Sequence, residues 1–169
     1  MDDFDEFYRA TSRRLLQYAY ALSADLGAAQ DLTQEAYVRA WQRWSRLRGY
    51  ENPEAWLRLV VTRLSTDRWR RLGLHRRVHA GLRPPDPAPE PSVDTVLLIA
   101  ALKRLPPPQR RAVALHYLMD LSVAEIAAET GASTGTVKSW LARGRAALAT
   151  QLSAQPAAPT LSNGGSDAR

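Results

Sequence analysis

The fold of this chain is decided by one stretch of its sequence, LSVAEIAAETGASTGTVKSWLARGRAAL, which spans Leu121–Leu148. Ser122 and Glu125 have the spacing of a capping box, in which two side chains satisfy free backbone donors at the start of a helix. Gly131 can adopt the left-handed conformation that ends a helix, and either residue of Ser133–Thr134 can cap a second helix. The stretch therefore predicts a helix-turn-helix, whose second helix can enter the major groove of DNA.

The second helix of this stretch is basic. It carries Lys138, Arg143 and Arg145 and no acidic residue. Positive charge without opposing acids on a helix of this kind favours DNA binding. The alternative is an ordinary helical hairpin with a solvated basic face.

Composition narrows the class of protein and its partners. The chain has 169 residues, enough for one compact domain or two small ones, and a formal net charge of +6. This charge favours a polyanionic partner, either nucleic acid or an acidic membrane surface. The absence of cysteine excludes disulfides and thiolate metal sites. No apolar run approaches the ~18 residues of a membrane span, and the chain begins with acidic residues, so we expect a cytoplasmic protein without membrane insertion.

A second basic stretch lies between Arg58 and Arg83. It contains eight arginines against a single acid, Asp67. Most of it has helical spacing, so the arginines form a basic stripe of the kind that follows a phosphate backbone.

The distribution of glycine, proline and apolar residues predicts an all-α fold, because apolar spacing between the breaks is helical. Five prolines between Pro84 and Pro91 predict an extended linker, and the small polar residues from Ser153 predict a disordered tail. The predicted helices cover residues 3–23, 27–45, 53–72, 93–104, 108–118, 122–130 and 134–151. We therefore expect two separate small helical domains, residues 1–75 and 93–152, joined by a Pro-rich linker, residues 76–92, and followed by a tail, residues 153–169.

Three motifs in this order resemble those of one family. They are DLTQEAYVRAWQRW (Asp31–Trp44), NPEAWLRLVVTRLSTDRWRR (Asn52–Arg71) and LPPPQRRAVALHYLMDLSVAEIAAETGASTGTVKSWLARGRAAL (Leu105–Leu148). The chain resembles bacterial RNA polymerase sigma factors of the extracytoplasmic-function (ECF) group of the sigma-70 superfamily, which have only the region 2 and region 4 domains. The resemblance implies a protein that binds core RNA polymerase, recognises the −10 and −35 elements of promoters and initiates transcription of a specific gene set.

The first motif is implied to contact the polymerase. The resemblance places Asp31–Trp44 against the clamp helices of the largest subunit, and it makes the polymerase flap a further partner. Two carboxylates four residues apart share one face of a helix, and an exposed aromatic residue is a good interface anchor. The candidate polymerase-binding residues are Asp31, Gln34, Glu35, Arg39 and Trp41.

The second motif resembles the part of the family that opens and reads the −10 element. Single-stranded DNA is held by stacking on aromatic groups and by a basic groove. The candidates are Tyr50, Asn52, Arg58, Val61, Arg63, Arg68, Arg70 and Arg71, of which Arg68, Arg70 and Arg71 are expected to contact phosphates. Trp56 and Leu59 are expected in the core. The family often has Asn at the position of Arg63, a departure that bears on which base is chosen.

The third motif resembles the reader of the −35 element. Lysine and arginine can bond guanine O6 and N7, while others grip phosphate. The candidates are Thr134, Thr136, Lys138, Ser139, Trp140, Arg143 and Arg145. Family members frequently carry Arg at the position of Trp140. Its indole could pack on a thymine methyl or on the neighbouring helix, and the sequence leaves both open.

Metal and enzyme chemistry are not expected. His75 and His79 have the spacing of a helical metal pair, but no Glu or Cys completes a set and the arginines between them would repel a cation. The sequence contains neither a nucleophile elbow nor a phosphate-binding glycine loop, so we expect no cofactor and no enzymatic activity.

Two other functions compete with the sigma-factor reading. A helix-turn-helix regulator would bind DNA without polymerase and use Met1–Arg71 for sensing or dimerisation. An adaptor would bind only proteins, and the basic stretch argues against it. Because members of the family are commonly held inactive by an anti-sigma protein, such a protein is a candidate partner here.

Overall fold

The structure is a computed structural model that describes residues 2–75 and 91–154. These residues form helices and no strand, which confirms the predicted all-α class. The helices are α1 (Asp2–Ser23), α2 (Leu26–Gln42), α3 (Trp44–Leu47), α4 (Pro53–His75), α5 (Val93–Lys103), α6 (Pro107–Tyr117), α7 (Val123–Thr130) and α8 (Thr134–Ser153).

The ends of the predicted helices lie within three residues of the observed ones. The helix expected over residues 27–45 ends early, at Gln42, because the backbone at Arg43 leaves the helical conformation and a short helix, α3, follows. α8 reaches Ser153, so the expected tail begins one residue too early. Most of the predicted linker and tail, and the arginines after α4, lie outside the described residues.

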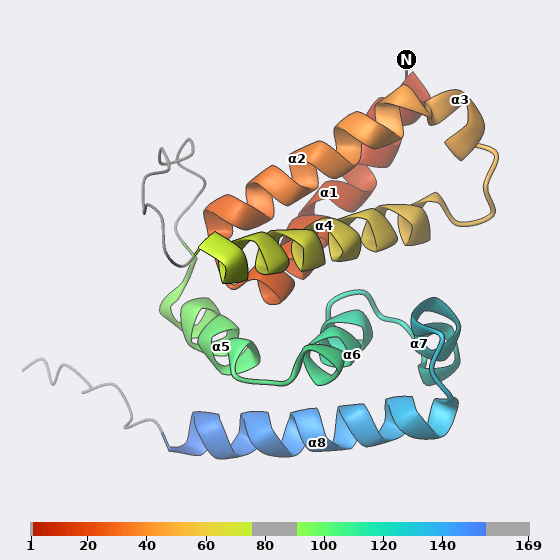
Figure 1. The fold of residues 1–169 in the computed structure, drawn as a ribbon. Coiled ribbons are helices and arrows are strands. Elements are labelled where there is room, and N and C mark those ends of the chain that lie inside the picture. Colours follow the sequence, from red (N-terminus) through yellow and green to blue (C-terminus); the bar gives the residue numbers. More distant parts are fainter. Residues whose placement is uncertain (1, 76–90, 155–169) are drawn as a thin grey trace, which may run out of the picture.

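Helices α1–α4 form the N-terminal unit. α1 and α2 lie side by side, and α4 packs across both (Figure 1). Leu15 and Tyr18 of α1 and Leu57 of α4 are fully buried between them. Asp25 caps α2 by accepting a hydrogen bond from the backbone N–H of Ala28 at 2.9 Å.

Helices α5–α8 form the C-terminal unit, which contains the predicted helix-turn-helix. The capping box at the start of α7 is present: Ser122 Oγ accepts from the Glu125 N–H at 3.2 Å, and the Ser122 N–H donates to Glu125 Oε2 at 2.7 Å. Gly131 has a φ of +74° and ends α7, and Ser133 caps α8. The turn chemistry read from the sequence therefore gives the observed helix pair.

α8 crosses α6 at close range. A Cβ added at Gly144 of α8 would lie 2.7 Å from Val113 Cγ2 of α6. Only glycine permits this approach, and it brings Leu141 of α8 into the core.

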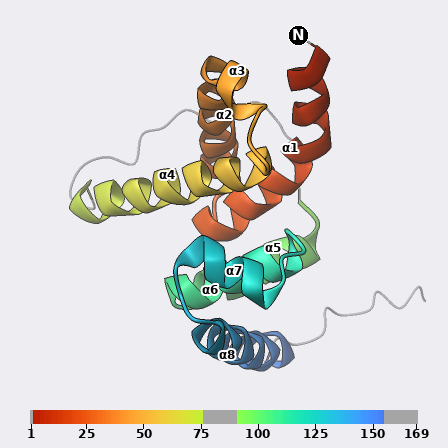
Figure 2. The same cartoon turned by 90° about the vertical axis from the view of Figure 1, so that its right-hand side faces the viewer.

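The two units pack against each other, contrary to the expectation of separate bundles. α1 contacts both α5 and α6, and α5 and α6 also contact α8. In Figures 1 and 2, α5 and α6 therefore lie between the N-terminal helices and α8. A side-chain contact also joins α6 to α1: Arg110 Nη1 donates to the Leu22 carbonyl at 3.2 Å. The sequence pattern predicted the helices of each unit but not this contact, because it is formed by residues far apart in the chain.

Candidate functional site

The candidate polymerase-binding residues all lie on the solvent-exposed face of α2. Asp31, Gln34, Glu35 and Arg39 are exposed, and Trp41 is 52% exposed. The opposite face of the helix is apolar and buried, and includes Leu32, Ala36 and Ala40. This pattern turns the polar residues outward. Glu35 Oε1 accepts from Arg39 Nε at 2.7 Å, so these two side chains hold each other along the helix.

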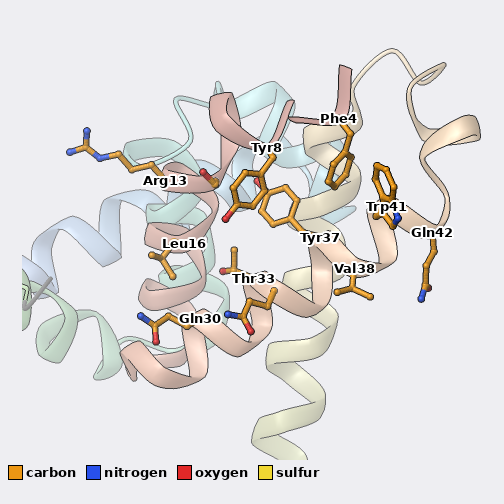
Figure 3. Close-up of a pocket in the computed structure, with 12 residues that line it drawn as sticks. Phe4, Tyr8, Arg13, Leu16, Gln30, Thr33, Tyr37, Val38, Trp41 and Gln42 are labelled. Carbon is orange, nitrogen blue, oxygen red and sulfur yellow. The ribbon is translucent and has the colours of Figure 1, made fainter. Parts of the chain in front are cut away.

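Gln34 and Trp41 line a groove between α1 and α2 with a volume of about 750 Å³. Aromatic, aliphatic and polar side chains line the groove (Figure 3). The rings of Phe4 and Trp41 pack edge to face with their centroids 5.0 Å apart, and the rings of Tyr8 and Tyr37 do the same with a centroid distance of 4.7 Å. Burial raises the pKa of Tyr37 to about 12, and its hydroxyl shares a 2.7 Å hydrogen bond with Thr11 Oγ1. Aromatic rings therefore line one part of the groove, and the hydroxyl of Tyr37 is held by Thr11.

Asp31, Glu35 and Arg39 line a second, smaller groove, between α2 and α4. Its volume is about 400 Å³, and its other side is formed by residues of α4 that include Arg68 and Arg71. The candidate polymerase surface and part of the candidate −10 surface thus meet in one groove.

Most of the candidate −10 residues are accessible. Tyr50 is 42% exposed, and the side chains of Arg63, Arg70 and Arg71 are exposed while Arg68 is half-buried. Asn52 is exposed too, but its Oδ1 accepts from the Ala55 N–H at 2.9 Å and so caps α4.

Two candidate −10 residues are not accessible in this structure. Val61 is fully buried in the core of the N-terminal unit, so its assignment as a DNA contact is wrong: it lies on the face of α4 that packs inward. Arg58 is only 3% exposed, and its guanidinium is engaged by Glu129 of α7. Its assignment does not hold for this arrangement of the units, because α7 covers it. Trp56 and Leu59 are half-buried, and Trp56 packs on the core as predicted.

The candidate −35 residues lie on α8. Thr134, Thr136, Lys138, Arg143 and Arg145 are exposed, and Ser139 is half-buried. Arg145 Nη1 also lies 3.4 Å from the hydroxyl of Tyr117.

The structure shows one of the two contacts expected of Trp140. The side chain is half-buried and packs on the core of the unit. Contact of its remaining exposed surface with a thymine methyl stays a prediction.

Sequence reasoning missed the residues that join the units. Glu129 forms the ion pair with Arg58, and Arg110 reaches Leu22 across the junction. Burial raises the pKa of Tyr18, whose hydroxyl meets Thr62 Oγ1 at 2.9 Å near the same junction. No local pattern points to these residues, since each acts on a partner far away in the sequence.

The described ranges show no group of three or more side chains that could hold a metal ion. The side chains of His75 and His79 lie outside what the structure describes. None of the helices in residues 2–75 and 91–154 is long and apolar enough to cross a membrane.

Comparison with known proteins identifies both units. Residues 7–74 match the family model of sigma-70 region 2, and residues 95–148 match that of sigma-70 region 4. The chain is 37% identical to the RNA polymerase sigma-E factor of Streptomyces coelicolor over 90% of its own length and 88% of that protein. It is 35% identical to the ECF RNA polymerase sigma factor SigE of Mycolicibacterium smegmatis, over 88% of this chain and 61% of that one.

A solved structure shows the same fold. The sigma factor RpoE of Bartonella quintana, in complex with the anti-sigma factor NepR, superposes with a TM-score of 0.75 at 26% identity. The match covers 92% of this chain and all of that one. With both regions matched, in the predicted order, this chain belongs to the sigma-70 family of RNA polymerase sigma factors, in its ECF group.

Proposed function

We propose that this protein binds core RNA polymerase through α2, reads the two promoter elements with its two units, and so initiates transcription at a specific set of promoters. One observation supports this most directly: an exposed acidic and aromatic face on α2 and a capped helix-turn-helix occur in the same chain. A DNA-binding regulator needs only the second of these. The protein itself contributes binding energy, while the polymerase performs the chemistry in the bacterial cytoplasm.

The polymerase contact is assigned to Asp31, Gln34, Glu35, Arg39 and Trp41. Trp41 presents about half of its surface to solvent in the groove between α1 and α2, as an interface anchor requires. Exposed carboxylates beside it add charge complementarity, which sets orientation more than affinity.

The contact with melted DNA is assigned to the surface around the start and outer face of α4. Tyr50 offers a ring on which a base can stack, and Arg63, Arg70 and Arg71 offer cations to the phosphates. Asn52 is tied to the N-terminus of α4, so its first role is to position this loop.

The contact with duplex DNA is assigned to the first turns of α8. Thr134, Thr136 and Lys138 lie at its exposed beginning, the part of a recognition helix that reaches base edges. Arg143 and Arg145, further along, suit phosphates. Trp140 supports the helix from within.

Run-off transcription with core polymerase on genomic fragments tests the proposal. Asp31→Ala with Glu35→Ala should weaken binding to polymerase, whereas Lys138→Ala should spare that binding and impair promoter choice. If the wild-type protein binds duplex promoter DNA tightly without polymerase and does not direct transcription, the regulator reading is correct instead. If both variants lose polymerase equally, the division of labour between the units is wrong.

An anti-sigma protein is included among the proposed partners because the solved relative from Bartonella quintana is bound to one. Copurification from native extract tests this. Recovery of polymerase without any inhibitor would argue against it.

A further inference from the structure

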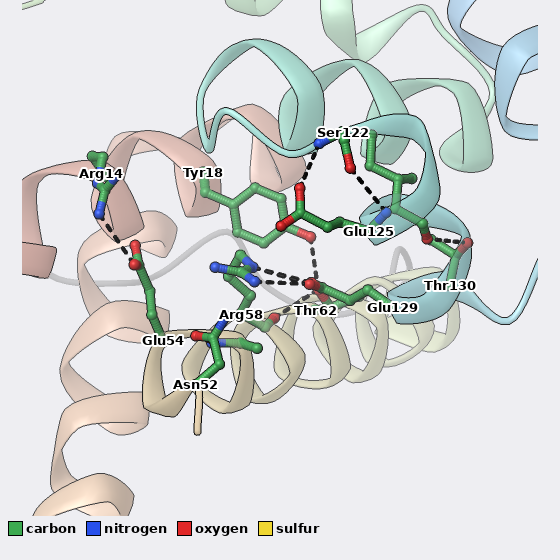
Figure 4. Close-up of polar contacts among 12 residues, drawn as sticks. Arg14, Tyr18, Asn52, Glu54, Arg58, Thr62, Ser122, Glu125, Glu129 and Thr130 are labelled. Carbon is green, nitrogen blue, oxygen red and sulfur yellow. Dashed lines mark hydrogen bonds and ion pairs between the residues drawn. The ribbon is translucent and has the colours of Figure 1, made fainter. Parts of the chain in front are cut away.

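The ion pair between Arg58 and Glu129 is the most deeply placed charged contact in the described part of the chain. Arg58 Nε lies 3.2 Å from both oxygens of Glu129, and Nη2 lies 2.9 Å from Oε2 (Figure 4). The two side chains are 4% and 11% exposed. The pair joins α4 of the N-terminal unit to α7 of the helix-turn-helix, across 71 residues of sequence.

The position of Glu129 on α7 is unfavourable by itself. It is the last residue but one of the helix, where the macrodipole disfavours a negative charge. A buried carboxylate is also costly unless it is paired. Arg58 compensates both costs, because Nε and Nη2 of its guanidinium both donate hydrogen bonds to the Glu129 carboxylate. The contact therefore depends on the two units being together.

This arrangement conflicts with simultaneous promoter binding. The −10 and −35 elements lie roughly two duplex turns apart, or about 70 Å. Here the −10 helix α4 and the helix-turn-helix touch through a 2.9 Å hydrogen bond. The 23 residues of α4 span only about 34 Å, so no site on it can bridge the gap to α7. The units must separate before both elements can be bound.

We infer that Glu129 is an internal competitor for DNA: its carboxylate occupies the Arg58 guanidinium in place of a phosphate and holds the protein closed. This inference rests on the proposed function, which makes α4 a DNA-binding helix. A guanidinium recognises carboxylate and phosphate with the same planar fork, so one side chain can exchange one anion for the other. In the closed form Arg58 is masked, whereas Thr134, Thr136 and Lys138 of α8 stay exposed. Opening releases Arg58 to the melted strand and lets the units move apart.

The experiment measures closure and DNA binding separately in the full chain. The sequence has no cysteine, so Ala10→Cys on α1 and Ala149→Cys on α8, both exposed, accept spin labels for a distance measurement between the units. The binding probe is a fluorescein-labelled single-stranded oligonucleotide of mixed sequence, without polymerase.

Glu129→Gln should lengthen the distance distribution and raise the affinity for the probe by about tenfold, because apparent affinity scales with the open fraction. The matched control is Glu6→Gln. It removes one carboxylate charge at an exposed position of α1, outside the surfaces assigned to DNA, and should change neither readout. The exchange Arg58→Glu with Glu129→Arg should keep the protein closed without the gain in affinity.

Three results would overturn the inference. They are an unchanged distance and affinity in Glu129→Gln, a longer distance without any gain in affinity, or an exchange variant that opens as far as Glu129→Gln. Run-off transcription by the wild type reports on the proposed function independently, since the distance measurement tests closure whether or not transcription occurs.

Discussion

Arg110 donates more hydrogen bonds than any other side chain in the described ranges. Its guanidinium donates to the carbonyls of Leu102, Lys103 and Leu105 at 2.9–3.1 Å, and to that of Leu22 at 3.2 Å. Leu102 and Lys103 end α5, where helix carbonyls have no intrahelical partner, and Leu105 lies two residues beyond the helix. The side chain is 8% exposed, and burial lowers the pKa of the guanidinium. Replacing it should therefore destabilise the C-terminal unit.

The expected size follows from these bonds. A hydrogen bond from a charged donor contributes about 1.5 kcal/mol at the low end of its range, so the three bonds within the unit are worth about 4–5 kcal/mol. In Arg110→Met, the new apolar side chain returns about 1–2 kcal/mol through burial. The net loss is about 3 kcal/mol. For a cooperative unit of this size the loss should lower Tm by roughly 12–24 °C.

Thermal and urea unfolding, followed by circular dichroism, measure this loss. Arg104→Met is the matched control, because Arg104 is the C-cap of α5, whose last carbonyls Arg110 contacts, and its own side chain is exposed. It should shift Tm by no more than about 4 °C. If Arg110→Met and Arg104→Met unfold at the same temperature, the hydrogen bonds of Arg110 do not stabilise the unit and the reasoning fails.

Three further predictions concern local features. Gly144→Ala should lower the free energy of unfolding by about 1 kcal/mol, because overpacking against Val113 outweighs the gain in helix propensity; a higher urea midpoint would contradict this. Hydrogen bonds with Ser122 lower the pKa of Glu125 in the folded protein. The ionised carboxylate therefore stabilises the fold at pH values above the ordinary pKa of glutamate, and this stabilisation is lost as the pH falls through the lowered pKa of the folded state. The stability difference between wild type and Glu125→Ala should accordingly shrink below about pH 4, in urea titrations at several pH values. Tyr37, with its pKa raised to about 12, should ionise late in a spectrophotometric titration, and Tyr37→Phe should remove that step; stability should fall from about pH 10 upward, since the unfolded tyrosine ionises first.

The helices and their caps could be predicted because their causes are local. Ser122 and Glu125 are three residues apart, and Gly131 needs only its own backbone freedom to end α7. The exposed face of α2 could be predicted in the same way, because Asp31 and Glu35 are four residues apart and so share one side of the helix. Patterns of this kind contain the whole interaction within one or two turns of helix.

The junction between the units could not be predicted, because its causes are distant. Arg58 fits a basic stripe by sequence, and nothing beside it indicates that Glu129 covers it. Val61 was assigned to DNA by the resemblance, although its side chain faces the core. The sequence shows only approximately which side of α4 is buried, because half-buried residues such as Trp56 and Leu59 border its buried side.

The carbonyl of Leu22 has a consequence for how this protein can change over generations. It accepts from Trp69 Nε1 of α4 at 3.4 Å and from Arg110 of α6. A main-chain oxygen is present whatever residue stands at that position. Substitution of Trp69 or Arg110 removes one of these hydrogen bonds. Substitution of the Leu22 side chain leaves the accepting carbonyl in place.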